Sequence, residues 1–251
     1  MPYKFIADFN CWSVDCQMKD LFKRFIPQFS TLLVICLIAG YGFIKKDFID
    51  TKSKYIYRPT IIIDAGHGGF DGGAVAFDGT VEKDINLSIA KKLGVLLNFS
   101  GFDIIMTRTD DTATNTIEGS IAKRKKSDLK NRLELMEKNK DAIYVSIHLN
   151  KFTTSSASGA QVFYTPNFKE ASTLGGEIQS SITSLLQPDN TRVIKMGTSS
   201  TYILKNAKVP TVIVECGFLS NTNELKKLKD KKYQTQMSFA IAVGILNFYK
   251  E

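Results

Sequence analysis

Ile61-Ile62-Ile63-Asp64-Ala65-Gly66-His67-Gly68-Gly69-Phe70-Asp71-Gly72-Gly73 is the stretch that decides the fold. A run of β-branched residues leads into a loop with five glycines, and His67 lies at the junction. A buried strand followed by a glycine-rich turn is typical of α/β enzymes, which bind ligands beyond the carboxyl ends of their strands. The stretch therefore predicts a core strand over residues 59–64 with a functional loop after it.

Two later runs have the same character. The apolar run 142–147 leads into His148, the second of the two histidines in the chain, and the run 210–214 leads into Glu215. If the three strands are parallel neighbours, their carboxyl ends meet at one edge of the sheet, and these side chains converge there. Two neutral imidazoles and one carboxylate are the minimum set of protein ligands for a catalytic zinc with an open position for water.

Apolar periodicity predicts the remaining elements. We expect further strands at residues 102–108, 142–148, 159–164, 201–204 and 210–215, and helices at residues 85–99, 129–138, 171–186 and 234–249. This alternation predicts a single α/β domain, with a mostly parallel central sheet and helices on both faces.

The amino-terminal part predicts a membrane anchor. Residues 25–44 carry no charged side chain and have about the length of 20 residues that a bilayer span requires. We expect a cytoplasmic segment at 1–24, a transmembrane signal anchor at 25–44, a linker at 45–58 and the catalytic domain at 59–251. The anchor is expected to remain uncleaved, because Gly40-Tyr41-Gly42 is a poor cleavage site, and Met18 is a hypothetical second start.

The composition limits the classes of binding partner that we expect. The 251 residues carry a formal net charge of +8, with a pI near 9.2, which favours contact with polyanions such as anionic cell wall. No basic helix interleaved with aromatic residues is present, so no nucleic-acid partner is expected. Of the four cysteines only Cys216 lies within the predicted domain, and we interpret it as a small buried residue rather than a nucleophile.

The residues alone leave the choice of carboxylate open. Glu82 and Glu215 are both candidates, one as a metal ligand and the other as general base toward a metal-bound water. A carboxylate at the start of a helix, as expected for Glu82, is also favoured simply by the helix dipole. Asp64, Asp71 and Asp84 lie near enough in the sequence to remain candidates.

Six motifs, in order along residues 60–250, together resemble those of the zinc-dependent N-acetylmuramoyl-L-alanine amidases. They are Asp64-Ala65-Gly66-His67-Gly68-Gly69, Glu82-Lys83-Asp84-Ile85-Asn86-Leu87, Met106-Thr107-Arg108, Asp128-Leu129-Lys130-Asn131-Arg132, Ser146-Ile147-His148-Leu149-Asn150 and Val214-Glu215-Cys216-Gly217-Phe218-Leu219-Ser220-Asn221. The basic run before Asp128 and the single membrane-proximal segment most resemble the spore-cortex amidases, which implies a role in spore cortex maturation.

The resemblance implies that His67, Glu82 and His148 bind Zn²⁺ and that Glu215 is the catalytic glutamate. It implies hydrolysis of the amide between N-acetylmuramic acid and L-alanine of the peptidoglycan stem peptide. We interpret four further polar residues as substrate or supporting groups, with structural ion pairs as the alternative for the arginines: Asn86, Arg108, Arg132 and Asn150. The domain is then expected outside the cytoplasm, in the cell wall or the spore intermembrane space, with an activating protein partner left open.

Two other functions compete with this interpretation. A zinc peptidase would cut within the stem peptide and leave L-alanine on the sugar, whereas a non-catalytic activator would bind the wall and release no new amine. A phosphate-binding loop is excluded, because no Gly-Lys-Ser/Thr follows the glycines and the glycines surround a histidine.

Overall fold

The computed structural model describes residues 60–198 and 201–250. The predicted cytoplasmic segment, transmembrane anchor and linker lie outside the described residues. Within the described part of the chain, no helix combines the length and the hydropathy that a bilayer crossing requires.

The centre of the domain is a six-stranded sheet, counted over the described residues. Its strands are β1 (Ile61–Ala65), β2 (Ile104–Met106), β3 (Ile143–Asn150), β4 (Gln161–Tyr164), β5 (Lys195–Met196) and β6 (Thr211–Phe218), in the order β2-β1-β3-β6-β4-β5. The first four strands in this order are mutually parallel, whereas β4 pairs with β6 in the antiparallel sense and β5 follows β4. The prediction of a mostly parallel sheet is confirmed.

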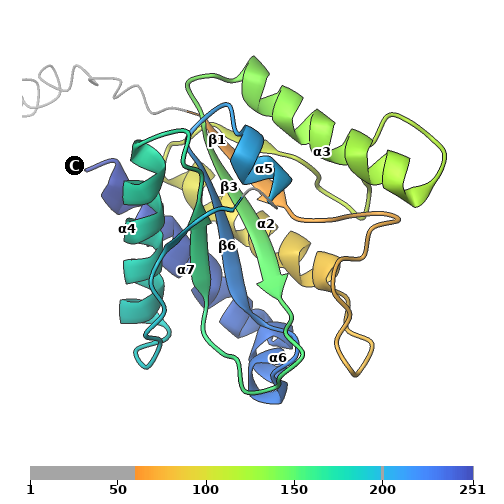
Figure 1. Cartoon of the computed structure of the whole chain (residues 1–251). Coiled ribbons are helices and arrows are strands. Elements are labelled where there is room, and N and C mark those ends of the chain that lie inside the picture. The colour runs from red at the N-terminus through yellow and green to blue at the C-terminus, as the bar shows by residue number, and fades with distance from the viewer. Residues whose placement is uncertain (1–59, 199–200, 251) are drawn as a thin grey trace, which may run out of the picture. The chain divides into compact units, whose positions relative to one another are not determined.

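Helices cover both faces of this sheet, as predicted (Figure 1). They are α2 (Glu82–Phe99), α3 (Ile121–Lys138), α4 (Glu170–Leu185), α5 (Tyr202–Asn206), α6 (Thr222–Lys229) and α7 (Lys231–Phe248). The helices α2, α4 and α7 pack on one face, and α3 and α5 pack on the other.

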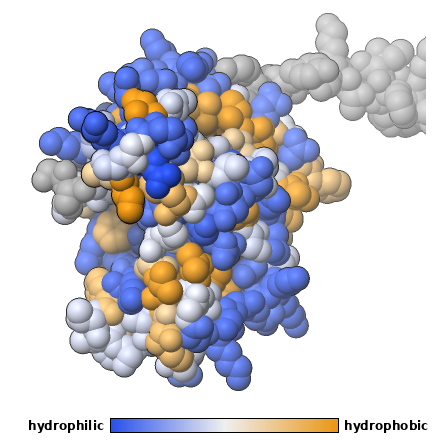
Figure 2. Space-filling view, turned by 90° about the vertical axis from the view of Figure 1, so that its right-hand side faces the viewer, coloured by the Kyte–Doolittle hydropathy of each residue, from blue (hydrophilic) through white to orange (hydrophobic). Residues whose placement is uncertain are grey.

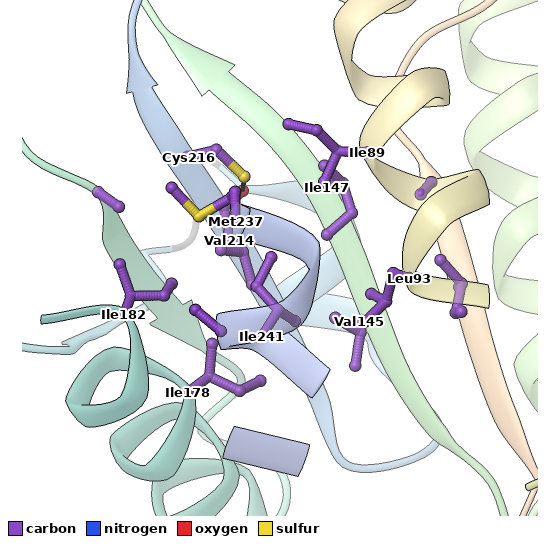
Figure 3. Packing of buried hydrophobic residues seen from close by; sticks show 14 of the residues in the cluster. Ile89, Leu93, Val145, Ile147, Ile178, Ile182, Val214, Cys216, Met237 and Ile241 are labelled. Atoms are coloured by element: carbon purple, nitrogen blue, oxygen red, sulfur yellow. Dashed lines mark hydrogen bonds between the residues drawn. The ribbon is translucent and has the colours of Figure 1, made fainter. Parts of the chain in front are cut away.

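The main core lies between the sheet and the first of these helical layers. Figure 3 shows Val214 of β6 beside Ile241 of α7, whereas Ile147 and Val145 of β3 lie beside Ile89 and Leu93 of α2. Alternate residues of each strand face this core, and the residues between them face the second layer. Ile62 and Tyr144 belong to that second cluster, so the three-layer arrangement explains why the strands are apolar without interruption.

The side chain of Cys216 also lies in the main core and is fully buried. Burial raises the pKa of its thiol far above the usual range. Both observations confirm the interpretation of Cys216 as a small core residue.

One predicted strand is wrong. Residues 201–204 were expected to be extended, but Tyr202–Asn206 form the short helix α5. Ile203 and Leu204 are adjacent and both buried, which a helical turn allows and a strand with alternating faces does not. The Leu204 carbonyl also accepts a hydrogen bond of 2.6 Å from the buried Thr165 hydroxyl.

Other elements begin or end at residues that differ from those predicted by the apolar periodicity. Helix α3 begins at Ile121 rather than near residue 129, because Ser120 accepts a hydrogen bond from the backbone N–H of Lys123 and the basic run continues as a solvated helix face. Figure 2 shows the side of the domain on which α3 lies, where hydrophilic side chains surround smaller apolar areas. The elements α6 and β5 have no counterpart in the prediction, because both are too short for apolar periodicity to show.

Candidate metal centre and active site

His67 follows the carboxyl end of β1 in a left-handed backbone conformation, with φ of 64°. This conformation is uncommon for a residue with a side chain, and histidine is one of the residues that tolerate it. The loop also brings Gly66 so close to the His148 imidazole that a Cβ at position 66 would overlap the ring. At Gly73, with φ of 71°, a Cβ would lie 2.6 Å from the Glu82 carboxylate. Glycines thus allow the loop to close around the imidazoles.

Glu82 is the first residue of α2 and is buried. Its Oε2 accepts a hydrogen bond of 2.8 Å from the Ala74 backbone N–H and lies 3.4 Å from His67 Nε2. Its Oε1 lies 3.1 Å from His148 Nδ1 and accepts a bond of 3.0 Å from the Leu149 backbone N–H. The start of α2 therefore places one carboxylate between the two imidazoles.

His148 and Glu215 lie on neighbouring strands. They are register partners in the parallel pair of β3 and β6, so their side chains extend from the same face of the sheet. Both residues are half-buried, and Glu215 Oε2 is buried without a hydrogen-bond partner in the described part of the chain. The strands expected to carry these residues do bring them together.

The charges in this cluster shift the titration of its members. Burial raises the pKa of Glu215 to about 7. Burial acts in the same direction on Glu82, but hydrogen bonds from His148 and His67 outweigh it and hold the Glu82 pKa well below its usual range. Burial opposes protonation of His67, yet the carboxylates of Asp71 and Glu82 raise its pKa to about 9. The surroundings thus favour the charged form of the Glu82 carboxylate and the protonated form of the Glu215 carboxylate, each relative to a free glutamate.

The three side chains of His67, Glu82 and His148 form a metal-binding cluster. Each offers one ligand atom, and these atoms lie within 4.8 Å of one another. Two imidazoles and one carboxylate are typical ligands of divalent transition metals, zinc among them. Glu215 Oε2, beside the cluster, is buried and has no hydrogen-bond partner among the described residues. A metal centre with a bound polar molecule would supply such a partner.

Asp71 orients the first imidazole. Its Oδ2 accepts a hydrogen bond of 2.9 Å from His67 Nδ1, which leaves Nε2 to face Glu82. Its Oδ1 lies 2.8 Å from Lys125 Nζ on α3. Carboxylates that bind the outer nitrogen of a ligand histidine fix its tautomer and its direction. From the sequence alone, Asp71 is only an alternative candidate for the carboxylate of the site. Its spacing of four residues after His67 is the signal for a supporting role.

Arg108 and Arg132 are buried beneath the same loop. Arg108 donates to the carbonyls of Ala65 and Gly66, at 2.9 and 3.1 Å, and Arg132 donates to the carbonyl of His67 at 3.0 Å. Arg132 also pairs with the carboxylates of Asp64 and Asp128. These contacts with backbone carbonyls and carboxylates hold the loop in place.

The two asparagines lie at different depths. Asn86 is buried on α2, where its Nδ2 donates to Glu82 Oε1 and to the Gly66 carbonyl, each at 3.2 Å. Asn150 ends β3, and its carbonyl accepts a hydrogen bond of 2.8 Å from the Leu219 backbone N–H. Asn86 therefore contacts the metal-binding cluster directly, whereas the described contacts of Asn150 are with the neighbouring loops.

Several known proteins are similar to this chain in sequence and in fold. The profile of the N-acetylmuramoyl-L-alanine amidase family matches residues 61–247. The germination-specific N-acetylmuramoyl-L-alanine amidase of Bacillus subtilis (strain 168) is 34% identical over 221 residues, which are 87% of this chain and 92% of that protein.

Solved structures give the same assignment. The CwlD amidase from Clostridioides difficile, in complex with the GerS lipoprotein, matches with a TM-score of 0.74 and 40% identity over 77% of this chain and 99% of that chain. An N-acetylmuramoyl-L-alanine amidase from Clostridium difficile 630 matches with a TM-score of 0.66 and 31% identity over 77% and 97%. This chain therefore belongs to the N-acetylmuramoyl-L-alanine amidase family and hydrolyses peptidoglycan at the amide between N-acetylmuramic acid and L-alanine.

Proposed function

We propose that the protein is a zinc amidase in which His67, Glu82 and His148 hold the metal and Glu215 is the catalytic glutamate. The observation that carries the proposal is the cluster itself: three ligand atoms within 4.8 Å, beside the Glu215 carboxylate, whose Oε2 is buried and unpartnered. The choice between Glu82 and Glu215 follows from their contacts, because the described neighbours of Glu82 include both imidazoles.

Glu215 moves the proton in this mechanism. When bound, zinc lowers the pKa of a water and polarises a carbonyl oxygen. Glu215 accepts a proton from the attacking water, whose oxygen forms a bond to the lactyl carbonyl carbon. The bond from this carbon to the L-alanine nitrogen then breaks, and Glu215 returns the proton to that nitrogen. The sugar keeps a free lactyl carboxylate, and the peptide leaves with a free amine.

Burial adjusts the pKa of Glu215 to a value that suits proton transfer. A group that both takes and returns a proton works best with a pKa near the operating pH, and burial raises the Glu215 pKa to about 7. Its position on β6, paired with β3, holds the carboxyl group rigidly relative to His148. Asn86 and the two arginines support this geometry from beneath and take no part in proton transfer.

Product mass tests the proposed zinc requirement and the bond that is cut. Residues 45–251 are incubated with purified peptidoglycan, first after chelation and then with zinc restored, and the muropeptides are weighed. We expect peptides with a free L-alanine amine only when zinc is present. Activity that survives complete chelation, or L-alanine that remains on the sugar, would contradict the proposal.

We also propose a role in the spore, with the domain held at a membrane by residues 25–44. As a cell-wall amidase the protein acts outside the cytoplasm. The germination-specific relative and the spore-cortex motifs support the first part, and the charge-free stretch supports the second. To test the spore role, the gene is deleted in a spore former, whose cortex should then lack the products of this amidase. To test the anchor, the full-length protein is fractionated and should be recovered in the membrane fraction.

The complex of the similar CwlD amidase with the GerS lipoprotein supports a third proposal, that a lipoprotein also binds this chain. Purified full-length protein would be mixed with the lipoproteins of its own organism that are made during sporulation. We expect one of them to form a complex stable to gel filtration. If none of these lipoproteins elutes together with the protein, the proposal is contradicted.

A further inference from the structure

Two large apolar side chains lie exposed on the last turns of α2. Phe99 is 93% exposed and Val95 is 70% exposed. They are four residues apart, so they lie on the same side of the helix, one turn from each other. Single exposed apolar side chains are ordinary on protein surfaces, but adjoining ones rimmed by polar residues mark sites that contact a protein or a membrane.

These side chains lie at the end of the domain where the chain enters it. Ile61 at the start of β1 donates a hydrogen bond of 2.9 Å to the Asp103 carbonyl, just after α2. The Phe102 ring lies 5.2 Å from the Tyr249 ring at the end of α7. The end of α2, the start of β1 and the end of α7 are therefore neighbours (Figure 1). The metal-binding cluster lies at the opposite, carboxyl ends of the strands.

Lysines surround this end of the domain. Those in the connections and helix ends next to the strand starts are Lys138, Lys140, Lys169, Lys205, Lys208 and Lys250, all exposed. Among the described residues, the exposed carboxylates there are fewer: Asp103, Glu137, Asp141 and Glu170. Lysines near a membrane surface are attracted to its anionic lipid headgroups.

We propose that this end of the domain, with Phe99 and Val95 inserted, docks on the surface of a phospholipid bilayer that carries anionic headgroups. The inference rests on the proposed anchor at residues 25–44. Only residues 45–59 separate that segment from the domain, and a chain of this length spans at most about 50 Å. The linker thus attaches to the same end that carries the apolar side chains.

The chemistry of the surface favours lipid over a protein partner. A stable protein interface removes about 800 Å² from each partner and has an apolar centre. Two apolar side chains among lysines instead match shallow insertion at the headgroup boundary, where apolar and electrostatic attraction add. Docking in this orientation directs His67, Glu82 and His148 away from the bilayer and toward the wall.

Vesicle binding by the domain without its anchor tests the inference. Residues 45–251 are suitable, because the similar solved chains correspond to this domain over 97–99% of their lengths. The fragment is sedimented with vesicles of phosphatidylcholine, with and without phosphatidylglycerol, up to several millimolar lipid. This range matches the effective concentration, about millimolar, that a short tether provides.

We expect binding to the vesicles with phosphatidylglycerol and about ten-fold weaker binding for Phe99→Ser, from the apolar area removed. The matched control is Phe77→Ser, because Phe77 is 74% exposed but lies in the loop beside the metal-binding cluster. The control should bind vesicles as the unaltered fragment does. Thermal unfolding and hydrolysis of soluble peptidoglycan fragments should be the same for Phe99→Ser and the unaltered fragment, which shows that the fold is retained.

Three results would overturn the inference. They are no vesicle binding at any lipid concentration used, equal binding by Phe99→Ser and the unaltered fragment, or equal losses for Phe99→Ser and Phe77→Ser. A Phe99→Ser protein that binds vesicles normally but loses a protein partner would assign the surface to that partner. The proposed anchor at residues 25–44 is tested separately. Full-length protein that is not recovered in the membrane fraction would contradict the anchor alone.

Discussion

At the scale of single residues, His67 and Glu215 are expected to fail in different ways. We predict that His67→Ala loses both zinc and activity, because it removes one of three ligands. Glu215→Gln should keep zinc and lose activity by about 10²–10⁴-fold, the usual contribution of a general acid–base group. Metal content and the rate of amine release, measured on the same samples, check both. A Glu215→Gln protein without zinc would mean that Glu215 is a ligand.

Arg132 is expected to matter through the fold of the loop. Replacing it with Met leaves Asp64 buried without its charged partner, and this kind of change destabilises proteins by about 3–5 kcal/mol. Zinc affinity should fall as well, because Arg132 holds the carbonyl of His67. Urea unfolding and zinc titration measure the two effects.

Lys130 of the same helix provides the control for Arg132. It forms an exposed pair with Glu134, at 3.7 Å, so Lys130→Met should change stability by less than about 1 kcal/mol. If both substitutions had the same small effect on unfolding and zinc binding, the support assigned to Arg132 would be wrong.

At the scale of elements, the packing of α4 against α7 depends on Gly244. A Cβ at this position would lie 2.5 Å from the Ile178 Cα and 2.8 Å from the Glu177 carbonyl oxygen, and neither backbone atom can move independently. We therefore predict that Gly244→Ala destabilises the domain by about 1–3 kcal/mol, the usual effect of overpacking. Urea unfolding measures it.

Gly176, on α4, is the matched glycine. A Cβ there meets no atom within 4 Å, so Gly176→Ala should be neutral or stabilise by up to about 1 kcal/mol through helix propensity. Equal destabilisation by both substitutions would show that the close approach of the helices is not the cause.

At the scale of the whole molecule, zinc is expected to stabilise the domain, because its proposed ligands come from β3, the start of α2 and the loop after β1. A ligand at 100 times its Kd adds about 2.7 kcal/mol to the free energy of unfolding. For a domain of this size, that raises Tm by about 5–10 °C. Calorimetry before and after chelation checks this, and His67→Ala should show no zinc-dependent change.

The sequence by itself determined the fold class and the edge of the sheet that carries the site. Uninterrupted apolar runs predict buried parallel strands, and the carboxyl ends of such strands share one edge. His67, His148 and Glu215 are predictable in this way, because His148 and Glu215 lie in the carboxyl-terminal halves of β3 and β6 and His67 lies two residues after β1. The family motifs then assigned the chemistry to these positions.

Residue spacing left open which carboxylate lies between the imidazoles, and the family motifs implied Glu82. In the tertiary structure Glu82 lies there, because a glycine loop without periodicity brings the start of α2 to both rings. Only the tertiary structure decided that residues 202–206 are helical, that β4 runs against β6, and that Arg108 and Arg132 contact the backbone of the His67 loop. Each of these depends on contacts between residues far apart in the chain, and local patterns carry no information about such contacts. The sequence therefore determined which elements form the site, and the packed structure determined the neighbours of each side chain.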